Sequence, residues 1–196
     1  MSIILIIVII SVLFIIWFVS GYNFFVSSKA RIKAAVQEIG NQLKRQADLI
    51  PNLESSAKGY LKHEKEIYEK LTDARKSISK AIESGNVQSM VDAGEKISSL
   101  IPNLKVIIES NPELKSSEVV TKLMEELRDT SDKVMYARRL VIDLTADYNV
   151  KRATFPSNLI ASIFGFSEQP GLITPGNEES LKVSEEEMKT PKVKLD

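Results

Sequence analysis

Five polar residues between positions 45 and 64 have the types and the spacing that a small binding site would need: Arg45, Asp48, Asn52, His63 and Glu64. Arg45 and Asp48 lie three residues apart, so on a helix they share a face and can form an ion pair. An exposed pair of this kind contributes only roughly a few tenths of a kcal/mol, so a structural brace beside the following proline is the simpler interpretation. The amide of Asn52 would then bond backbone groups left free at that proline.

Glu64 has the strongest physical requirement of the five. It falls on an otherwise apolar helical seam, and a carboxylate that faces a core needs a partner or a raised pKa. A buried ion pair is the leading interpretation and a ligand or metal site is the alternative, because ion-pair networks perturb carboxylates much as functional sites do. The basic residues that could pair with it are Arg45, Arg138 and Arg139.

Catalytic chemistry finds little support in the sequence. His63 is the sole histidine and Tyr60 stands three residues before it, so the Glu-x-x-His motif of helical di-iron sites is absent. The chain also lacks cysteine, a Gly-x-Ser-x-Gly motif, a phosphate-binding glycine loop and a His-Glu-x-x-His motif. We therefore expect no enzyme activity, no catalytic residue, no metal and no cofactor.

Helical periodicity dominates the chain between residues 27 and 154. Apolar residues recur every three or four positions in four stretches, which are 27–50, 53–84, 87–110 and a last one from 112 or 116 to 154. These are seams of the coiled-coil kind, and no stretch alternates with the period of two that a strand requires. The pattern predicts an all-α fold, in which an N-terminal transmembrane helix precedes an antiparallel four-helix bundle with long helices.

Pro51 leaves the path of the chain open. Proline lacks a backbone N–H and clashes with the preceding turn, so the helix either kinks or stops there. If the chain reverses at Pro51, four helices alternate in direction and the apolar residues 159–166 return to the membrane, where they would lie at its interface or pack on the bundle. If Pro51 is only a kink, three arms remain and the same residues end far from the bilayer.

An apolar run near the N-terminus predicts a membrane anchor. Residues 3–19 carry no charge, and as a helix they are about 26 Å long, or about 36 Å if the run extends to residue 26. These lengths bracket a hydrocarbon core of about 30 Å, and no signal-peptide cleavage motif follows, so we expect an uncleaved anchor over residues 1–26. Lys29, Arg31 and Lys33 follow the run and no Lys or Arg precedes it, which predicts an outside N-terminus and a cytoplasmic C-terminal domain.

The rest of the chain divides by composition. Residues 27–166 are enough for one domain with its own core. Residues 167–196 carry seven acidic side chains against four lysines, together with glycine, proline and serine, and we expect them to form a disordered acidic tail. The formal net charge of the chain is zero, so nucleic acid is not an expected partner.

One block of sequence resembles the LemA family. It reads LKRQADLIPNL at residues 43–53, followed by KGY at 58–60 and HE at 63–64. Two positions depart from the family pattern, since Gln46 stands where relatives carry arginine and LVI at 140–142 replaces an x-Tyr-Asn. The resemblance implies a bacterial-type, membrane-anchored domain of four helices whose biochemical activity is undefined. Supporting matches are Tyr22-Asn23, Ala74-Arg75, Pro112-Glu113-Leu114-Lys115, Ala137-Arg138-Arg139, Tyr148-Asn149, Phe155-Pro156 and Gly165-Phe166.

These observations favour an adaptor or scaffold at the membrane. Its expected partners are the lipid bilayer, other membrane or cytoplasmic proteins and a second copy of the chain, which long apolar seams can recruit. The alternative is a ligand- or metal-responsive membrane sensor that uses Arg45, Asp48, His63 and Glu64. A sensor would melt at a higher temperature with its ligand, because a ligand that binds only the native state stabilises it.

Overall fold

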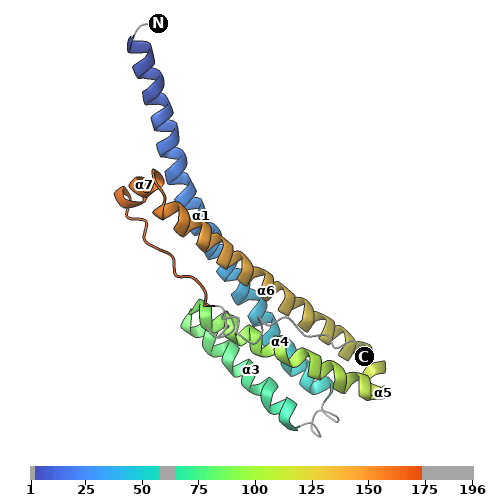
Figure 1. The fold of residues 1–196 in the computed structure, drawn as a ribbon. Coiled ribbons are helices and arrows are strands. Elements are labelled where there is room, and N and C mark those ends of the chain that lie inside the picture. The colour runs from blue at the N-terminus through green and yellow to red at the C-terminus, as the bar shows by residue number, and fades with distance from the viewer. Residues whose placement is uncertain (1–2, 58–64, 174–196) are drawn as a thin grey trace, which may run out of the picture.

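The computed structural model describes residues 3–57 and 65–173, and every regular element in these ranges is a helix, so the all-α prediction is confirmed. α6 lies along α1, while α3 and α4 form a shorter hairpin beside the part of that pair far from the N-terminus (Figure 1). The helices are α1 (Ile3–Ser56), α3 (Lys65–Ser84), α4 (Val87–Ser110), α5 (Pro112–Ser116), α6 (Glu118–Ala153) and α7 (Ser157–Ile163).

The first part of α1 stands free of the rest of the molecule. Its side chains are exposed from Ile3 to Ile16, and the first fully buried one is Phe25. Its most apolar window has a mean hydropathy of 3.3 and no buried residue. By length and composition, this helix can cross a membrane. Beyond Phe25 the same helix enters the protein core without a break.

Pro51 neither ends the helix nor reverses the chain. α1 continues through it to Ser56, so of the two alternatives left open by the sequence, a reversal at Pro51 is wrong. Proline removes one helical hydrogen bond, but Ile50 and Leu53 on either side of it are buried, and their packing keeps the chain helical. The next described helix, α3, packs against α1 and runs in the opposite direction (Figure 1).

The four long helices share one hydrophobic core. Most of the described apolar residues that recur every three or four positions are buried on each helix, which confirms the helical period of the sequence. Between α3 and α4, Gly85 adopts a φ of 64° that suits glycine, and the Asn86 side chain accepts the Ser89 N–H at 2.9 Å. Fully buried examples from the core are Leu43, Leu71, Ile78, Ile97, Leu104 and Leu127.

The C-terminal part of the described chain returns to the apolar half of α1. α7 packs beside α1 (Figure 1), with Ile160 buried against Gly21, where a Cβ would meet the end of the Ile160 side chain. Ring centroids of Phe164 and Tyr22 are 4.7 Å apart, and those of Phe166 and Phe25 are 4.9 Å apart. The three-arm arrangement expected for a kink at Pro51 is therefore wrong, because the chain reverses after α1 instead.

Residues 167–173 run in extended form from α7 to the start of α4 (Figure 1). The Tyr148 hydroxyl donates to the Ser167 carbonyl at 3.0 Å, and the Asn149 amide exchanges two hydrogen bonds with the Gln169 backbone. These residues, which the sequence predicts to be part of the tail, pack on the helices in the structure. The acidic tail prediction for 174–196 lies outside the described residues.

Candidate functional site

Arg45 and Asp48 do not pair with each other. The Arg45 guanidinium lies 3.4 Å from the Glu126 carboxylate of α6, with the two side chains 56 and 49% exposed. The Asp48 side chain is exposed on the surface of α1. An exposed pair of this kind contributes at most about 1 kcal/mol. Arg45 thus forms a surface ion pair between α1 and α6, rather than the predicted pair with Asp48 beside Pro51.

The other predicted site residues do not complete a site among the described residues. The Asn52 amide donates to the Asp48 backbone carbonyl at 3.2 Å, one turn earlier in α1. His63 and Glu64 lie outside the described ranges. Of their suggested partners, Arg138 forms an ion pair with Glu95 of α4 and Arg139 is exposed.

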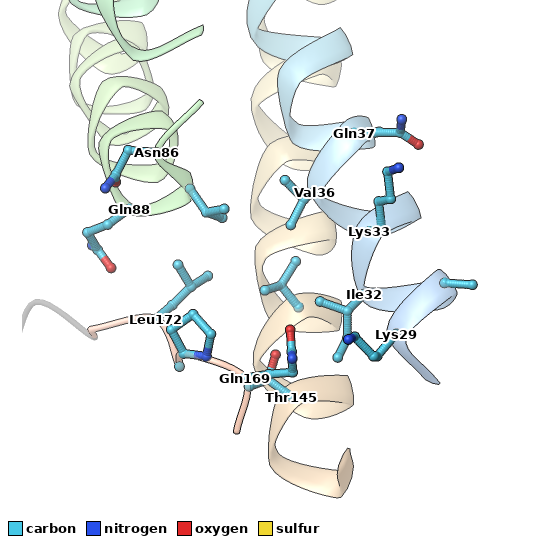
Figure 2. A pocket seen from close by; sticks show the side chains of 15 residues that line it. Lys29, Ile32, Lys33, Val36, Gln37, Asn86, Gln88, Thr145, Gln169 and Leu172 are labelled. Atoms are coloured by element: carbon cyan, nitrogen blue, oxygen red, sulfur yellow. The ribbon is translucent and has the colours of Figure 1, made fainter. Parts of the chain in front are cut away.

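A groove of about 690 Å³ opens between α1, α6, the start of α4 and the extended segment 167–173. In Figure 2, Ile32 and Val36 of α1 face Leu172 of the segment across this space. Val87 and Val141 add further apolar surface. Its volume lies within the range of about 300–1,000 Å³ that is typical of small-molecule sites. No spacing in the sequence signals it, because it is built by four segments distant in the chain.

Polar side chains also line this groove, among them two lysines and a buried threonine. Lys29 and Lys33 line its α1 side, and neither forms an ion pair with a described residue (Figure 2). Thr145 is 2% exposed, and its hydroxyl has no hydrogen-bond partner among the described residues. No carboxylate belongs to the described lining. The groove therefore suits an apolar group that carries a negative charge at one end.

A metal centre finds no support in the ranges that the structure describes. There, no three His, Asp or Glu side chains gather closely enough to hold an ion.

A sequence model of the LemA family matches residues 35–194, which is more than half of the chain. The chain belongs to the LemA family. None of the curated proteins matches it. LemA membership and the free-standing apolar half of α1 agree with a membrane-associated helical protein. The match begins beyond the apolar run and continues past Phe166, so the family domain includes the extended segment of the groove.

The position at which this LemA chain departs from the family arginine is buried. Gln46 is completely buried in α1, and its amide nitrogen donates to the Ser131 hydroxyl of α6 at 2.9 Å. Its amide oxygen has no hydrogen-bond partner among the described residues. Sequence reasoning identified the departure but not the burial, which depends on α6 packing against this turn of α1.

A second polar pair joins α4 and α6 in this LemA chain. The Arg138 guanidinium donates to the Glu95 carboxylate, and its side chain is 18% exposed. A groove of about 280 Å³ adjoins the pair, with Ser131 and Gly94 in its wall. Glu95 was not singled out from the sequence, because a lone glutamate on a helix surface carries no signal of its own.

Burial raises the pKa values of two ionisable groups. Burial raises the pKa of the Glu54 carboxyl, while the charge of Arg75 and the hydroxyl of Thr72 act in the opposite direction. Burial also raises the pKa of the Tyr148 phenol. Tyr148 therefore stays protonated at neutral pH and can hold the extended segment through its bond to Ser167.

Proposed function

We propose that this LemA-family protein is a single-pass, membrane-anchored adaptor or scaffold. The apolar half of α1 crosses the bilayer, and the helical bundle binds other proteins on the cytoplasmic side without catalysing a reaction. The support for an adaptor is the family membership, the apolar run and the absence of a recognisable catalytic motif in the sequence.

The continuity of α1 carries this proposal. One helix of 54 residues contains both the apolar run and a full side of the bundle core, with no loop between them. From Val26 to Ser56 it covers about 45 Å at 1.5 Å per residue. A flexible linker would let the bundle change its distance from the bilayer, whereas a continuous helix holds the surface of the bundle at a set distance. This geometry suits the positioning of partners.

Photo-crosslinking in intact cells tests the adaptor role. A photoreactive residue replaces Tyr136 of α6 or Val106 of α4 in the full-length chain, since both are strongly exposed and outside the core. We expect discrete protein adducts from these positions. Ile9, within the apolar run, is the matched control for contact with lipid. If neither bundle position gives a protein adduct while the protein is present at normal levels, the adaptor proposal fails.

The orientation has its own test. Lys29, Arg31 and Lys33 follow the apolar run, and such an excess of basic residues favours the cytoplasmic side. Because the chain has no cysteine, Lys76→Cys introduces a unique thiol on an exposed turn of α3. We expect a membrane-impermeant thiol reagent to label it only after lysis. Labelling in intact cells would place the bundle outside.

A ligand-responsive role is the second candidate function. The groove supports it as a ligand site better than the predicted polar patch does. Its ligand class is a single-chain anionic amphiphile, whose apolar part would contact Ile32 and Leu172 and whose charge would meet Lys29 and Lys33. The probe is dodecanoate, added to the full chain in lipid nanodiscs. We expect a higher melting temperature for the wild type and a smaller rise for the Lys29→Ala/Lys33→Ala variant. Equal shifts, or none, would contradict this candidate.

A further inference from the structure

α7 and its flanks carry an apolar surface that no described residue covers. Residues 153–166 contain no charged side chain. Ile160 and Ala161 of α7 are buried against the rest of the molecule, whereas Leu159 and Ile163 are 50 and 68% exposed. Leu159 and Ile163 are four residues apart, so they share one face of the helix. A grouped apolar surface of this kind usually marks a contact with a membrane or another protein.

The place of α7 along α1 indicates what covers this surface. Phe164, at the end of α7, has its ring centroid 5.6 Å from that of Phe18 and 4.7 Å from that of Tyr22. A helix from Ile3 to Tyr22 is about 30 Å long, which equals the thickness of the hydrocarbon core. α7 therefore lies level with the boundary of that core, where aromatic side chains are favoured.

Basic side chains lie on the bundle side of this boundary. Lys29, Arg31 and Lys33 form no ion pair with a described residue, and the Lys151 ammonium lies 5.8 Å from the centroid of the Phe24 ring. At 1.5 Å per residue, Lys29 is about 10 Å beyond Tyr22, which is the depth of lipid headgroups. Basic groups at that depth attract anionic lipids.

We propose that α7 lies in the bilayer interface as a second membrane contact, with Leu159 and Ile163 among the acyl chains and the basic residues on anionic headgroups. The proposal rests on the anchor of the proposed function and deepens it. A single transmembrane helix can tilt and rotate, whereas two contacts set the tilt and the rotation of the bundle relative to the membrane. The groove beside residues 167–173 then opens near the headgroups.

Spin-label depth measurements test this contact in the full-length chain. Single cysteines replace Ile163, Tyr136 and Ile10 in a chain that has no other cysteine, and the protein is reconstituted in vesicles of zwitterionic and anionic lipids. We expect the label at Ile163 to be accessible to oxygen at a shallow depth, at Tyr136 to be aqueous, and at Ile10 to be deep.

The outcomes separate the two proposals. If the label at Ile163 is as aqueous as that at Tyr136, or is shielded from both oxygen and aqueous reagents by protein, the interfacial contact is wrong while the anchor stands. If the label at Ile10 is also aqueous, the anchor itself fails. In purely zwitterionic vesicles we expect a shallower label at Ile163, and an unchanged depth would exclude a role for the basic residues.

Two glutamate substitutions provide a control, because they add the same charge at neighbouring positions of α7. Ile163→Glu places a charge on the exposed apolar face, so a spin label at Leu159 should move toward the aqueous phase. Ser162 is exposed and lies next to Ile163 in the sequence, so Ser162→Glu adds the same charge beside that apolar pair. We expect it to leave the Leu159 label in place. Equal effects of the two substitutions would contradict insertion of this face.

Discussion

At the scale of single residues, the core of this protein contains polar groups that its apolar pattern does not reveal. Gln46 and Ser131 are both buried and meet across α1 and α6, and Glu54 is partly buried near the end of α1. A buried polar group costs free energy unless it is hydrogen-bonded. Their effects on stability are therefore measurable by substitutions that remove one partner or both.

The Gln46 pair predicts a non-additive result. Ser131→Ala leaves the Gln46 amide nitrogen buried without an acceptor, so we expect a loss of about 1–3 kcal/mol in the free energy of unfolding. The double variant Gln46→Met/Ser131→Ala removes both polar partners at similar volume and should recover most of that loss. Denaturant unfolding of the full chain in nanodiscs measures both. If the losses in the free energy of unfolding add up in the double variant, the hydrogen bond between Gln46 and Ser131 is not the source of the effect.

Glu54 predicts a pH dependence of stability. Burial raises the pKa of this carboxyl in the folded state above its ordinary value of 4.5. The stability that this carboxyl contributes is therefore fully present at pH values below its pKa in the unfolded chain. It is lost as the pH rises through its pKa in the folded protein. We expect Glu54→Gln to melt above the wild type at pH 7, with a smaller difference at pH 4. The exposed Glu66, whose pKa Lys70 lowers, is the control, and Glu66→Gln should not raise the melting temperature.

At the scale of elements, the close crossing of α4 over α1 and α6 depends on a glycine. A Cβ at Gly94 would lie 2.8 Å from the Val134 Cγ1 atom and 3.4 Å from the Leu43 Cδ2 atom. Gly40, also within a helix, has no atom within 4 Å of such a Cβ. Two glycines with the same helix propensity thus have opposite surroundings.

Alanine substitutions at these two glycines separate packing from helix propensity. Gly40→Ala should raise the free energy of unfolding by about 0.5–1 kcal/mol, because alanine favours the helix. Gly94→Ala gains the same propensity but overpacks the crossing at a cost of about 1–3 kcal/mol, so we expect a net loss. Thermal melting of both variants measures the difference. Equal stabilisation by the two substitutions would mean that the helices can separate at Gly94 without cost.

At the scale of the whole molecule, α1 consists of two connected parts. Its first part is exposed and apolar, and its second part packs in the core. Residues 3–16 contact little of the bundle, while Trp17, Phe18 and Phe24 already pack against its core residues. The portion needed to cross a membrane and the portion needed to fold can therefore be separated. Removing the first should change the location of the protein without unfolding it.

Deletion of residues 2–16 tests this separation. The full-length chain should stay with membranes through alkaline and high-salt washes and need detergent for release. The shortened chain should keep its helical circular dichroism and leave the membrane in high salt, because only the interfacial contact of α7 remains. Sedimentation of washed membranes measures both. Recovery of the full-length chain in the aqueous phase without detergent would contradict the anchor.

The sequence by itself determined the helical fold, the apolar run and the seam positions that are buried. These features follow from local periodicity and composition, which a single chain carries in full. It also led to the LemA family through the block around Asp48 and Pro51. It did not indicate that Arg45 pairs with Glu126, because Glu126 lies on a distant helix.

Only the tertiary structure decided where the chain turns, what Gln46 contacts and which segments enclose the groove. α1 passes through Pro51 because buried neighbours outweigh one lost hydrogen bond. α7 and residues 167–173 are held by contacts with Tyr22, Tyr148 and Asn149, which are far away in the sequence. Contacts of this kind depend on how whole helices pack, and no local pattern of residues encodes them.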